Sequence, residues 1–562
     1  MPSLIHHVRR HADKWVSIFV GTTVFLLLVG PQVLWPTYTM WMRWGDSAQH
    51  YYGWEFFRRS PLLQFPLGES PGFGVGYASS VVYTDSIPLL AIPLKYLTFW
   101  FDADFQYFGV WLLFCYVAQH FVALRLLRRL GSSIFVASVG ATFFVIAPLF
   151  LFRQTILGYG HMALVGHFLL LTAFLLAING SHRTWQWVAL LATSVLVQFY
   201  LFVMVALVWA FVIVRLITLR TGKGRQIVID IGVTVGVVVL VMWSAGYFSA
   251  GNSAEEGFGI YRADLATFLD PETFTTTKWS SIVPNQPVVP NNVDGTFEGF
   301  AFLGTGILLA SLWAVVSLVS WRRPLWTPSP DTHSHFSRLF PVAILCFVFS
   351  LSNNITFRVE RFLIPLPGSL EWLGNTLRAS GRFVWPLAYV LMLYVIVNVS
   401  RTLPPRVSAV IIVLLLAVQV IDSRIALRET RERFDDPSYE ESILQSIDWQ
   451  RLAKGRSRLI IDPPQYKGFV WQDFAEFALR EDMTTNASYL SRVDYQRLYE
   501  SEVRTRNSLL TRQLSPDTLY VVMRGSGAYA SLRNVLDSRD GALAPGVDAR
   551  FIDGMLAVVV KP

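Results

Sequence analysis

The sequence predicts an α-helical multi-pass membrane protein, with about 11 transmembrane helices, that ends in a soluble α/β domain. Only 15% of the residues are charged and the mean hydropathy is +0.42, whereas soluble domains carry about 25% charged residues. Apolar runs of about 20 residues recur over 1–423, and each is long enough to cross the hydrocarbon core as a helix. After about residue 430 the composition changes to that of a soluble domain.

The apolar runs define the expected spans. The first run follows basic residues and precedes no small-residue cleavage site, so we expect a retained helix rather than a signal peptide. The stretch 86–101 contains Pro88, Pro93 and Lys95, and we expect an interfacial or re-entrant helix there. Spanning helices are expected over residues 15–35, 106–127, 133–152, 163–179, 185–199, 201–219, 227–249, 299–320, 338–351, 382–400 and 405–423.

The basic residues predict the orientation of these spans. The net charge is +8, but Lys and Arg lie in short clusters between apolar runs, which is typical of topology signals and not of a nucleic-acid surface. When 86–101 is not counted as a span, every short basic connection falls on one side, including RLLRRL at 125–130. The amino terminus is then cytoplasmic and the carboxyl-terminal tail is external.

This orientation divides the chain into two expected domains. Residues 1–423 form a transmembrane domain whose external loops 36–105, 250–298 and 352–381 are long and aromatic, which is typical of functional loops. Residues 424–562 form an external α/β domain. Its strands are predicted for RSRLIIDPP and DTLYVVMRG, its helices for WQDFAEFALR and AYASLRNVLD, and a final hairpin for FIDGMLAVVVKP. This domain has no nucleophile elbow or phosphate loop, so we expect packing, partner recognition or covering of a membrane site.

The first external segment contains an acid in a polar and aromatic setting, MRWGDSAQHYYGWEFFRRS. Asp46 and Gln49 have the spacing of an N-cap and capping box, so Asp46 has a structural explanation. Helical spacing also places Asp46, Gln49, His50 and Gly53 on one face, which suits a polar ligand. Both readings stay open, with Asp46 as the catalytic candidate and Gln49 and His50 as substrate-binding candidates.

A second acid, Asp85, lies later in the same loop. It either caps the short helix expected over 86–101 or supplies a second carboxylate to the same external cavity. Paired carboxylates divide base and positioning roles or hold a divalent cation, and no other cofactor is predicted. Cys115 and Cys346 both lie within apolar runs, which argues against a disulfide framework or a cysteine-ligated metal.

Further polar candidates lie in the next external loops. Arg153 and His161 flank the connection 153–162, and His167 lies one turn inside the following span. His161 and His167 are six residues apart and share no helix face, so we predict no metal site within that helix. Glu298 lies at the entry of the span over 299–320, where it caps the helix or faces the cavity.

The loop 352–381 leads into NTLRASGRFVWP, which contains Arg378 and Arg382. Their spacing aligns them on one face if a helix begins there. Guanidinium groups bind phosphate in a bidentate manner, so this pair predicts a phosphate site. Anchoring of the helix at the interface is the alternative.

These features resemble the GT-C superfamily of polyprenyl-phosphate-dependent glycosyltransferases. The shared features are an acid just after the first span, a long first external loop with two interfacial helices, and an external soluble tail. Within this superfamily the chain resembles a largely uncharacterised family of bacterial multi-pass membrane proteins over most of 40–400. The motifs that carry the resemblance are GDSAQHYYGWEFFRRSP, SSVVYTDSIPLLAIPLK, GHMALVGH, FEGFAFLG and RASGRFVWP.

The resemblance implies a reaction at the periplasmic face of the bacterial inner membrane. Asp46 would act as the general base on an acceptor hydroxyl, which attacks the anomeric carbon with inversion. The donor would be a polyprenyl-phosphate-linked sugar, and the acceptor an envelope glycan, lipid or protein. Arg378 and Arg382, with Arg153 third, would stabilise the departing phosphate. The loop lacks the adjacent acid pair of the metal-dependent oligosaccharyltransferases, so no metal ligands are assigned.

Two other functions remain as alternatives. A lipid-linked-sugar flippase or transporter also needs external charges, but we find no clear internal repeat and the polar residues gather at one face. A non-catalytic envelope-polysaccharide assembly protein would use the tail as its interaction module. The sequence favours the glycosyltransferase over both.

Overall fold

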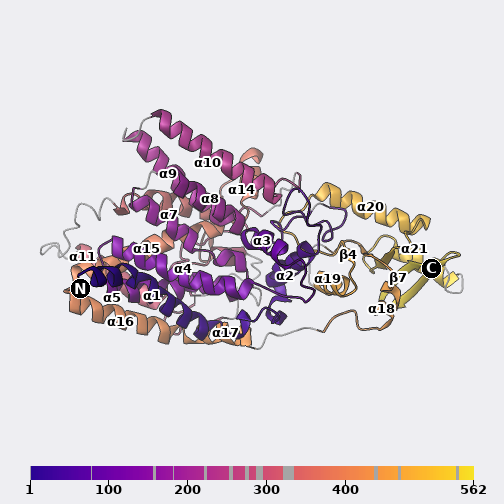
Figure 1. Ribbon diagram of the computed structural model, residues 1–562, viewed down its shortest axis with the longest axis horizontal. Helices are drawn as coiled ribbons and strands as arrows, with labels where there is room; N and C mark the ends of the chain where they lie inside the picture. The colour runs from indigo at the N-terminus through magenta and orange to yellow at the C-terminus, as the bar shows by residue number, and fades with distance from the viewer. Residues whose placement is uncertain are drawn as a thin grey trace. The chain divides into compact units, whose positions relative to one another are not determined.

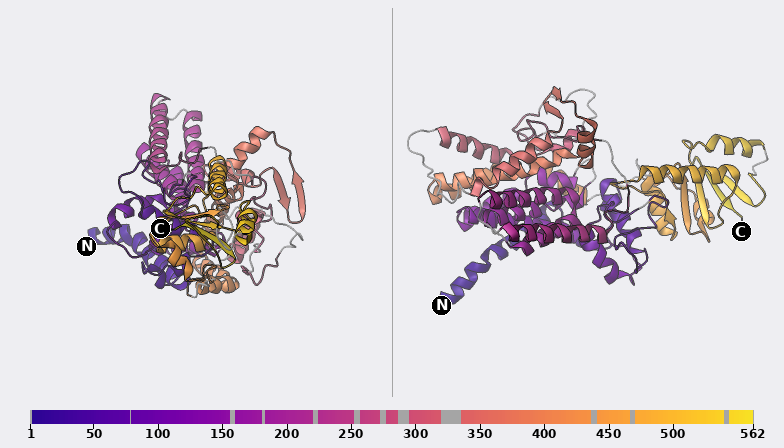
Figure 2. Two further views of the ribbon diagram at one scale, coloured as in Figure 1. Left: turned by 90° about the vertical axis from the view of Figure 1, so that its right-hand side faces the viewer. Right: turned by 90° about the horizontal axis from the view of Figure 1, so that it is seen from above.

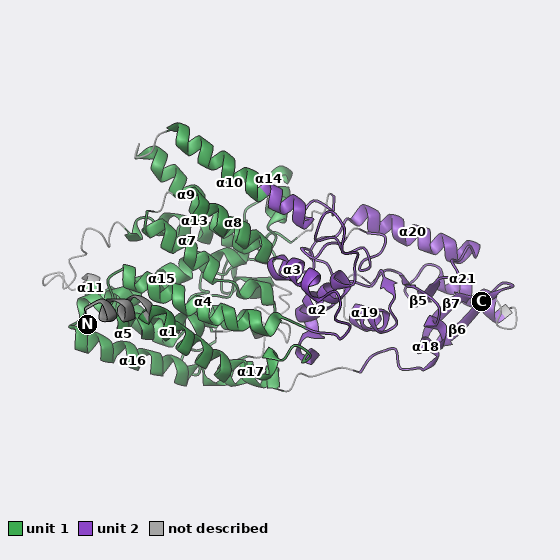
Figure 3. Cartoon of the chain, viewed as in Figure 1, with its two compact units in different colours: residues 1–38, 106–238, 254–437 green, residues 39–105, 239–253, 438–562 purple. Residues whose placement is uncertain are grey.

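The chain forms two compact units, and neither is continuous in sequence (Figures 1 and 3). Unit 1 comprises Met1–Tyr38, Gln106–Val238 and Ala254–Pro437, and unit 2 comprises Thr39–Phe105, Val239–Ser253 and Ser438–Pro562. The domain boundary near residue 424 that composition suggests stays a prediction. The computed structural model describes residues 2–77, 79–155, 160–180, 183–219, 224–251, 257–271, 277–285, 295–319, 335–435, 441–465, 470–538 and 543–561. The basic connections at 220–223 and 322–323 lie outside these ranges.

Each apolar run that was expected to span forms a helix. The stretch 86–101 forms only α3 (Pro88–Thr98), whose 11 residues extend for about 17 Å and cannot cross the hydrocarbon core. The helices of the apolar runs are α1 (Pro2–Leu28), α4 (Phe108–Arg129), α5 (Ile134–Val145), α6 (Pro148–Thr155), α7 (Phe168–Ile178), α8 (Thr184–Val197), α9 (Phe199–Thr218), α10 (Gly224–Ala245), α11 (Thr305–Val319), α13 (Phe340–Ser350), α15 (Trp385–Thr402) and α16 (Pro405–Asp422).

Several of these helices are long enough to identify a membrane protein. Within the described ranges, α4, α9, α10, α16 and the stretch Ser380–Thr402 around α15 have the length and apolar character of membrane spans. The pair α5 and α6 gives one more candidate if it is counted as a single bent span. Four further apolar segments are shorter, at 10–17 residues. The expected total of about 11 spans stays a prediction.

The run predicted as one helix over 133–152 is broken. Helices α5 and α6 meet at an angle of 41° because the helix ends at Ile146 and restarts at Pro148. Proline has no backbone N–H to continue the earlier helix, but it is well suited to a first helical turn. The break places Arg153 in a separate short helix.

Unit 1 is a helical bundle, seen from two further sides in Figure 2, and α15 lies in its most buried candidate span. In the span around α15, 83% of the residues are buried, against 17% in α10 and 22% in α16. Helix α1 packs on α4, α4 packs on α5 and α7, and α15 packs on α11 and α13. Gly21 of α1 allows the close approach to α4, because a Cβ there would lie 2.7 Å from the Val117 Cα. Helices α10 and α16 therefore leave most of their apolar residues unburied within the unit.

Short elements connect these helices on the side of the predicted external loops. Unit 1 contains the 3₁₀ turns η1 (Gln32–Leu34), η4 (Met162–Val165), η5 (Gly295–Gly299) and η6 (Ser380–Val384), the hairpin β1 (Asn354–Phe357) and β2 (Glu360–Leu363), and the helices α14 (Gly368–Thr376) and α17 (Arg424–Asp435). Turn η5 packs on η6, which brings two distant loops together.

Unit 2 combines the first external loop with the carboxyl-terminal α/β domain. The loop supplies η2 (Met40–Met42), α2 (Gly45–Arg58) and α3. The sheet order is β4-β3-β5-β7-β6, parallel through β4, β3 and β5 and antiparallel at β7 and β6. The domain's elements are α18 (Asp448–Ala453), β3 (Arg458–Asp462), α19 (Trp471–Arg480), β4 (Thr484–Thr485), α20 (Tyr495–Thr511), β5 (Thr518–Val522), α21 (Tyr529–Ser538), β6 (Val547–Ile552) and β7 (Met555–Val560).

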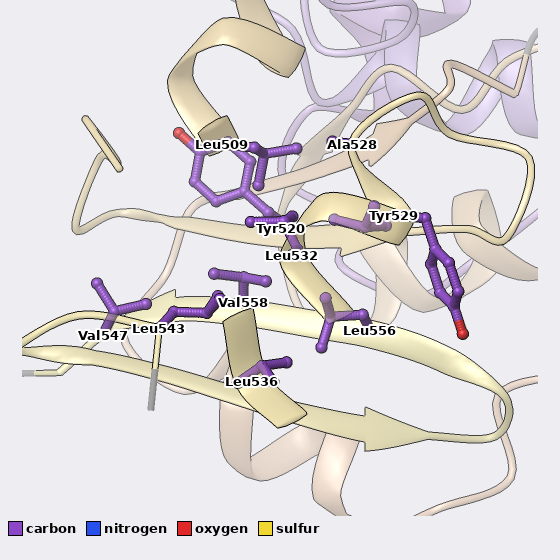
Figure 4. Packing of buried hydrophobic residues seen from close by; sticks show 11 residues of the cluster. Leu509, Tyr520, Ala528, Tyr529, Leu532, Leu536, Leu543, Val547, Leu556 and Val558 are labelled. Carbon is purple, nitrogen blue, oxygen red and sulfur yellow. The ribbon is translucent and has the colours of Figure 1, made fainter. Parts of the chain in front are cut away.

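The predicted elements of this domain are confirmed. Its final hairpin turns at Asp553 and Gly554, whose φ values of 48° and 79° fit the two-residue turn that matches strand twist. Alternate residues of β5 and β7 point to one face, where Tyr520 and Val558 pack against Leu532 of α21 (Figure 4). The α/β reading of the tail is therefore correct.

Candidate functional site

Asp46 lies in the first turn of α2 but does not cap it. The N-cap is Trp44, which makes no side-chain capping bond, and the Gln49 amide donates to the Tyr83 carbonyl at 2.8 Å. The predicted capping box is therefore wrong. Gly45, with a φ of 64°, turns the chain into the helix one residue earlier than the spacing suggests. Asp46 is the acid in the first turn of α2, where the helix dipole attracts negative charge.

The face of α2 that follows Asp46 packs against the segment 83–86. The His50 Nδ1 donates to the Thr84 carbonyl at 2.9 Å, and the Ser86 hydroxyl donates to the His50 carbonyl at 2.7 Å. A Cβ on Gly53 would lie 2.2 Å from the Thr84 Cβ, so only glycine permits this contact. Four residues were predicted to share a face of α2. Three of them, Gln49, His50 and Gly53, contact the segment 83–86.

Asp85 lies within that segment, in an uncommon backbone conformation. Asp85 and Ile87 have φ values of 51° and 52°, and a left-handed β-branched residue is a genuine outlier. The N-cap of α3 is Ile87, with no side-chain capping bond, so the predicted capping role of Asp85 is wrong. Outliers of this kind cost about 1–3 kcal/mol and cluster at functional sites.

Both acids are partly exposed beside buried residues. Residues 47–58 are buried, whereas Asp46 and the preceding Arg43, Trp44 and Gly45 are partly exposed. Residues 79–84 and 86–88 are buried as well, whereas Asp85 is partly exposed. Two buried segments that hydrogen-bond to each other therefore each include or adjoin one partly exposed acid.

Other charged residues near α2 have structural partners. Glu55 is fully buried, accepts from the Arg58 guanidinium at 2.7 Å and from the Phe105 amide at 3.1 Å, and its pKa is raised by burial. Lys95 of α3 donates to the Ser60 hydroxyl at 2.6 Å. These contacts fix the ends of the loop around α2.

In unit 1, Glu298 forms a charged triad with two arginines. Arg153 donates to Glu298 Oε2 at 2.6 Å and to its carbonyl at 2.8 Å. Arg382 donates Nε to Oε2 at 2.9 Å and Nη2 to Oε1 at 2.6 Å. Burial alone would raise the pKa of Glu298, but the two guanidinium groups outweigh it and hold that pKa well below its usual range. The triad carries one net positive charge.

Arg378 does not share a helix face with Arg382, so that prediction is wrong. Arg378 lies between α14 and η6, and its guanidinium is 5.7 Å from the centre of the Tyr261 ring. Helix α15 begins only at Trp385 because the preceding turn η6 packs its Gly381 against the Gly299 backbone. The Tyr261 ring also contacts Phe297, next to Glu298.

The two histidines occupy different settings. His161 precedes η4, and its backbone amide donates to the Arg153 carbonyl at 2.7 Å. His167 is fully buried, and its Nδ1 lies 2.6 Å from the Tyr389 hydroxyl, which also accepts from Gln119. Tyr389 and Gln119 were not predicted, although a polar residue within an apolar run is the signal that marks them.

The described part of the chain contains no group of three or more His, Cys, Asp or Glu residues that could hold a metal ion. The divalent cation suggested for Asp46 and Asp85 stays a prediction, since two carboxylates supply only part of a cation's oxygen ligands.

Comparison with known proteins gives a distant structural likeness and a family. One solved structure that is similar is the Archaeoglobus fulgidus oligosaccharyltransferase tethered to an acceptor peptide, at 14% identity and a TM-score of 0.42. The match covers 86% of this chain and spans 64% of the archaeal enzyme. No curated protein matches the sequence. Residues 448–558 match the DUF6311 C-terminal domain, and residues 18–424 match the domain of unknown function DUF6311. The chain therefore belongs to the DUF6311 family.

Proposed function

We propose that the protein is an integral membrane glycosyltransferase of the bacterial inner membrane. It transfers a sugar from a polyprenyl-phosphate donor to an envelope glycan, lipid or protein on the periplasmic side. In this proposal the chain crosses the membrane about 11 times, with a cytoplasmic amino terminus and a periplasmic carboxyl-terminal domain.

The reaction is an inverting displacement at the anomeric carbon. Asp46 accepts the proton of the acceptor hydroxyl as the new oxygen–carbon bond forms. The bond between the anomeric carbon and the phosphate oxygen breaks, and polyprenyl phosphate leaves with the bonding electrons. The helix dipole at the start of α2 and the carboxylate of Asp85, in the segment bonded to α2, orient the reacting groups.

One observation carries this proposal. Asp46 and Asp85 are the partly exposed acids of two buried segments, and these segments are joined by the bonds of Gln49 to Tyr83 and His50 to Thr84. These contacts hold Asp85 and Ile87 in left-handed backbone conformations. Carboxylates on a rigid frame suit acid–base chemistry, because the reacting atoms must be held to fractions of an ångström.

Phosphate binding is proposed for the arginines in the loops of unit 1, which carry positive charge. Arg153 and Arg382 together outweigh Glu298 by one charge, and Arg378 lies over the Tyr261 ring that contacts the same turn. This cluster supports a phosphate-binding role for Arg378 and Arg382. His161 belongs to the same site through its backbone bond to Arg153.

The test is sugar transfer from a panel of polyprenyl-phosphate sugars by the purified protein. Asp46→Asn keeps the shape of the side chain and should lower the transfer rate by about 10²–10⁴-fold, the usual contribution of a general base. Asp102→Asn, an exposed acid in the same loop, is the matched control and should transfer at the wild-type rate. Normal transfer by a folded Asp46→Asn protein would sink the assignment.

A lipid-linked-sugar flippase is the second candidate, favoured by buried polar groups inside the bundle. Gln119, Tyr389 and His167 form a hydrogen-bonded chain, and His120 bonds Ser17 at 3.0 Å. Polar residues within membrane helices often line transport pathways. Lipid scrambling in proteoliposomes, without transfer from any donor, would favour this function.

The topology has its own test. A reporter that is active only in the periplasm should be active when fused after Asp422. An inactive fusion would contradict the proposed orientation of the tail.

A further inference from the structure

Helix α19 of the carboxyl-terminal domain contacts the helix that carries Asp46. The Glu476 carboxylate accepts from the Arg43 guanidinium at 2.8 Å and from the Tyr52 hydroxyl at 3.0 Å. Arg43 lies three residues before Asp46, and Tyr52 lies six residues after it. The Glu476 carboxylate thus bonds one residue before Asp46 and one residue after it in the sequence.

The chemistry of this contact suits a fixed position. Burial and the charge of Glu476 raise the pKa of Tyr52 well above its usual value, so the hydroxyl keeps its proton and donates. The side chains of Arg43 and Glu476 are only 22% and 15% exposed, so solvent screens the ion pair incompletely. The Tyr52 ring also packs edge-on against Trp471, 5.8 Å between ring centres.

The same domain also holds the segment that carries Asp85. The Thr485 amide donates to Gly72, and the Thr485 carbonyl accepts from Gly74 and Val75, so the loop makes a single parallel bridge to β4. Further along, the Ser491 amide donates to the Tyr83 carbonyl at 2.7 Å.

Tyr83 links the two sets of contacts. Its carbonyl accepts from the Gln49 amide of α2 at 2.8 Å and from the Ser491 backbone amide. Both acid-bearing segments are therefore bonded to each other and to the carboxyl-terminal domain. A free interaction module would leave the first external loop without these partners.

We propose that Glu476 is a positioning residue for the reaction and that the carboxyl-terminal domain is part of the catalytic unit. Glu476 fixes the entry and second turn of α2, and the β4 edge with Ser491 fixes the segment of Asp85. This inference rests on the proposed function, in which Asp46 is the base. The carboxyl-terminal domain then affects the rate of sugar transfer by holding the first loop in place, whichever sugar is transferred.

The test compares Glu476→Ala and Glu476→Gln with wild type in the full-length protein. Glutamine retains an acceptor for Tyr52 but loses the charge that pairs with Arg43, so its effect should be intermediate. Asp548→Asn is the matched control, because Asp548 pairs with Arg550 on β6 and carries no contact to the first loop in the described structure. The readouts are kcat, KM and hydrogen exchange of peptides from α2 and 83–86.

Glu476→Ala should lower kcat by about 10–100-fold with KM within about twofold, because misplacing a reacting group by about 1 Å has effects of that size. Hydrogen exchange should rise in α2 and in 83–86, while Asp548→Asn changes neither readout. Wild-type kcat and exchange in Glu476→Ala would overturn the inference.

Two mixed results separate the inference from the proposed function. If exchange rises in these two segments but the wild type transfers no sugar, the positioning contact stands and the glycosyltransferase proposal fails. If exchange rises along the whole chain and kcat falls only in proportion to the unfolded fraction, Glu476 is merely structural and the inference fails.

Discussion

The charged groups of unit 1 and unit 2 are held in opposite ways. In unit 1, Glu298 pairs with both Arg153 and Arg382 within hydrogen-bond distance, which leaves one net positive charge. In unit 2, Asp46 and Asp85 are partly exposed beside buried segments, and one of them lies at a strained backbone position. The first arrangement pairs opposite charges, as burial of charge requires, and the second carries acids on a backbone frame that is itself hydrogen-bonded. The triad of unit 1 is therefore defined by its ion pairs, and the acids of unit 2 are defined by the segments that carry them.

The largest effect on stability is expected from removal of the Glu298 carboxylate, which Arg153 and Arg382 share in unit 1. Glu298→Ala removes the carboxylate shared by Arg153 and Arg382 and should lower the free energy of unfolding by about 3–5 kcal/mol. Thermal unfolding in detergent measures this loss. Glu432→Ala, which removes an exposed pair with Arg428 in α17, should change stability by less than about 1 kcal/mol. Equal stability of the two variants would contradict the triad's structural role.

A substitution with a smaller expected effect tests the contact that positions the segment of Asp85 in unit 2. Gly53→Ala puts a Cβ against Thr84 and should lower stability by about 1–3 kcal/mol while displacing the segment of Asp85. Gly236→Ala in α10 is the control, because no atom lies within 4 Å of its Cβ position. There, alanine should be neutral or stabilise the helix by up to about 1 kcal/mol. A Gly53→Ala protein as stable and active as the control would show that the contact does not matter.

The smallest effect concerns pH and Lys95, which ties α3 to the first loop. Burial lowers the pKa of Lys95 from 10.5 to about 8, so between these values the unfolded chain binds more protons than the folded chain. Stability from this group should therefore increase as the pH rises from about 8 to 10.5. The difference in unfolding temperature between wild type and Lys95→Met should change with pH over this interval. A constant difference would contradict the role of burial.

The sequence predicts the helices well because the membrane imposes a simple requirement. A run of about 20 apolar residues must satisfy its own backbone, and only a helix does so. The small domain was predicted for a similar reason, because the short apolar runs of β3 and β5 and the turn residues Asp553 and Gly554 specify strands and a hairpin. Local rules were sufficient for these elements.

The candidate site depends on backbone conformations and long-range contacts that residue spacing does not predict. The capping role of Asp46 failed because Gly45 adopts a left-handed conformation, and the Arg378–Arg382 face failed because α15 begins later at Trp385. The triad joins residues 145 positions apart, and Tyr52 meets Glu476 across 424 positions. Spacing within a segment carries no information about such contacts, so the roles of Glu298 and Glu476 required the fold.

The pairing of the first loop with β4 has a consequence for synthesis of the chain. Tyr77 bonds the carbonyl of Asn486 across 409 positions, so the partner of the first loop is made long after the loop itself. At about 5–20 residues per second, the ribosome needs about 20–80 s to bridge that interval. The first loop, which contains Asp46 and Asp85, therefore lacks its contacts with the carboxyl-terminal domain until the chain is nearly complete. A truncated or stalled chain would then lack an ordered first loop, which ties the onset of activity to the end of translation.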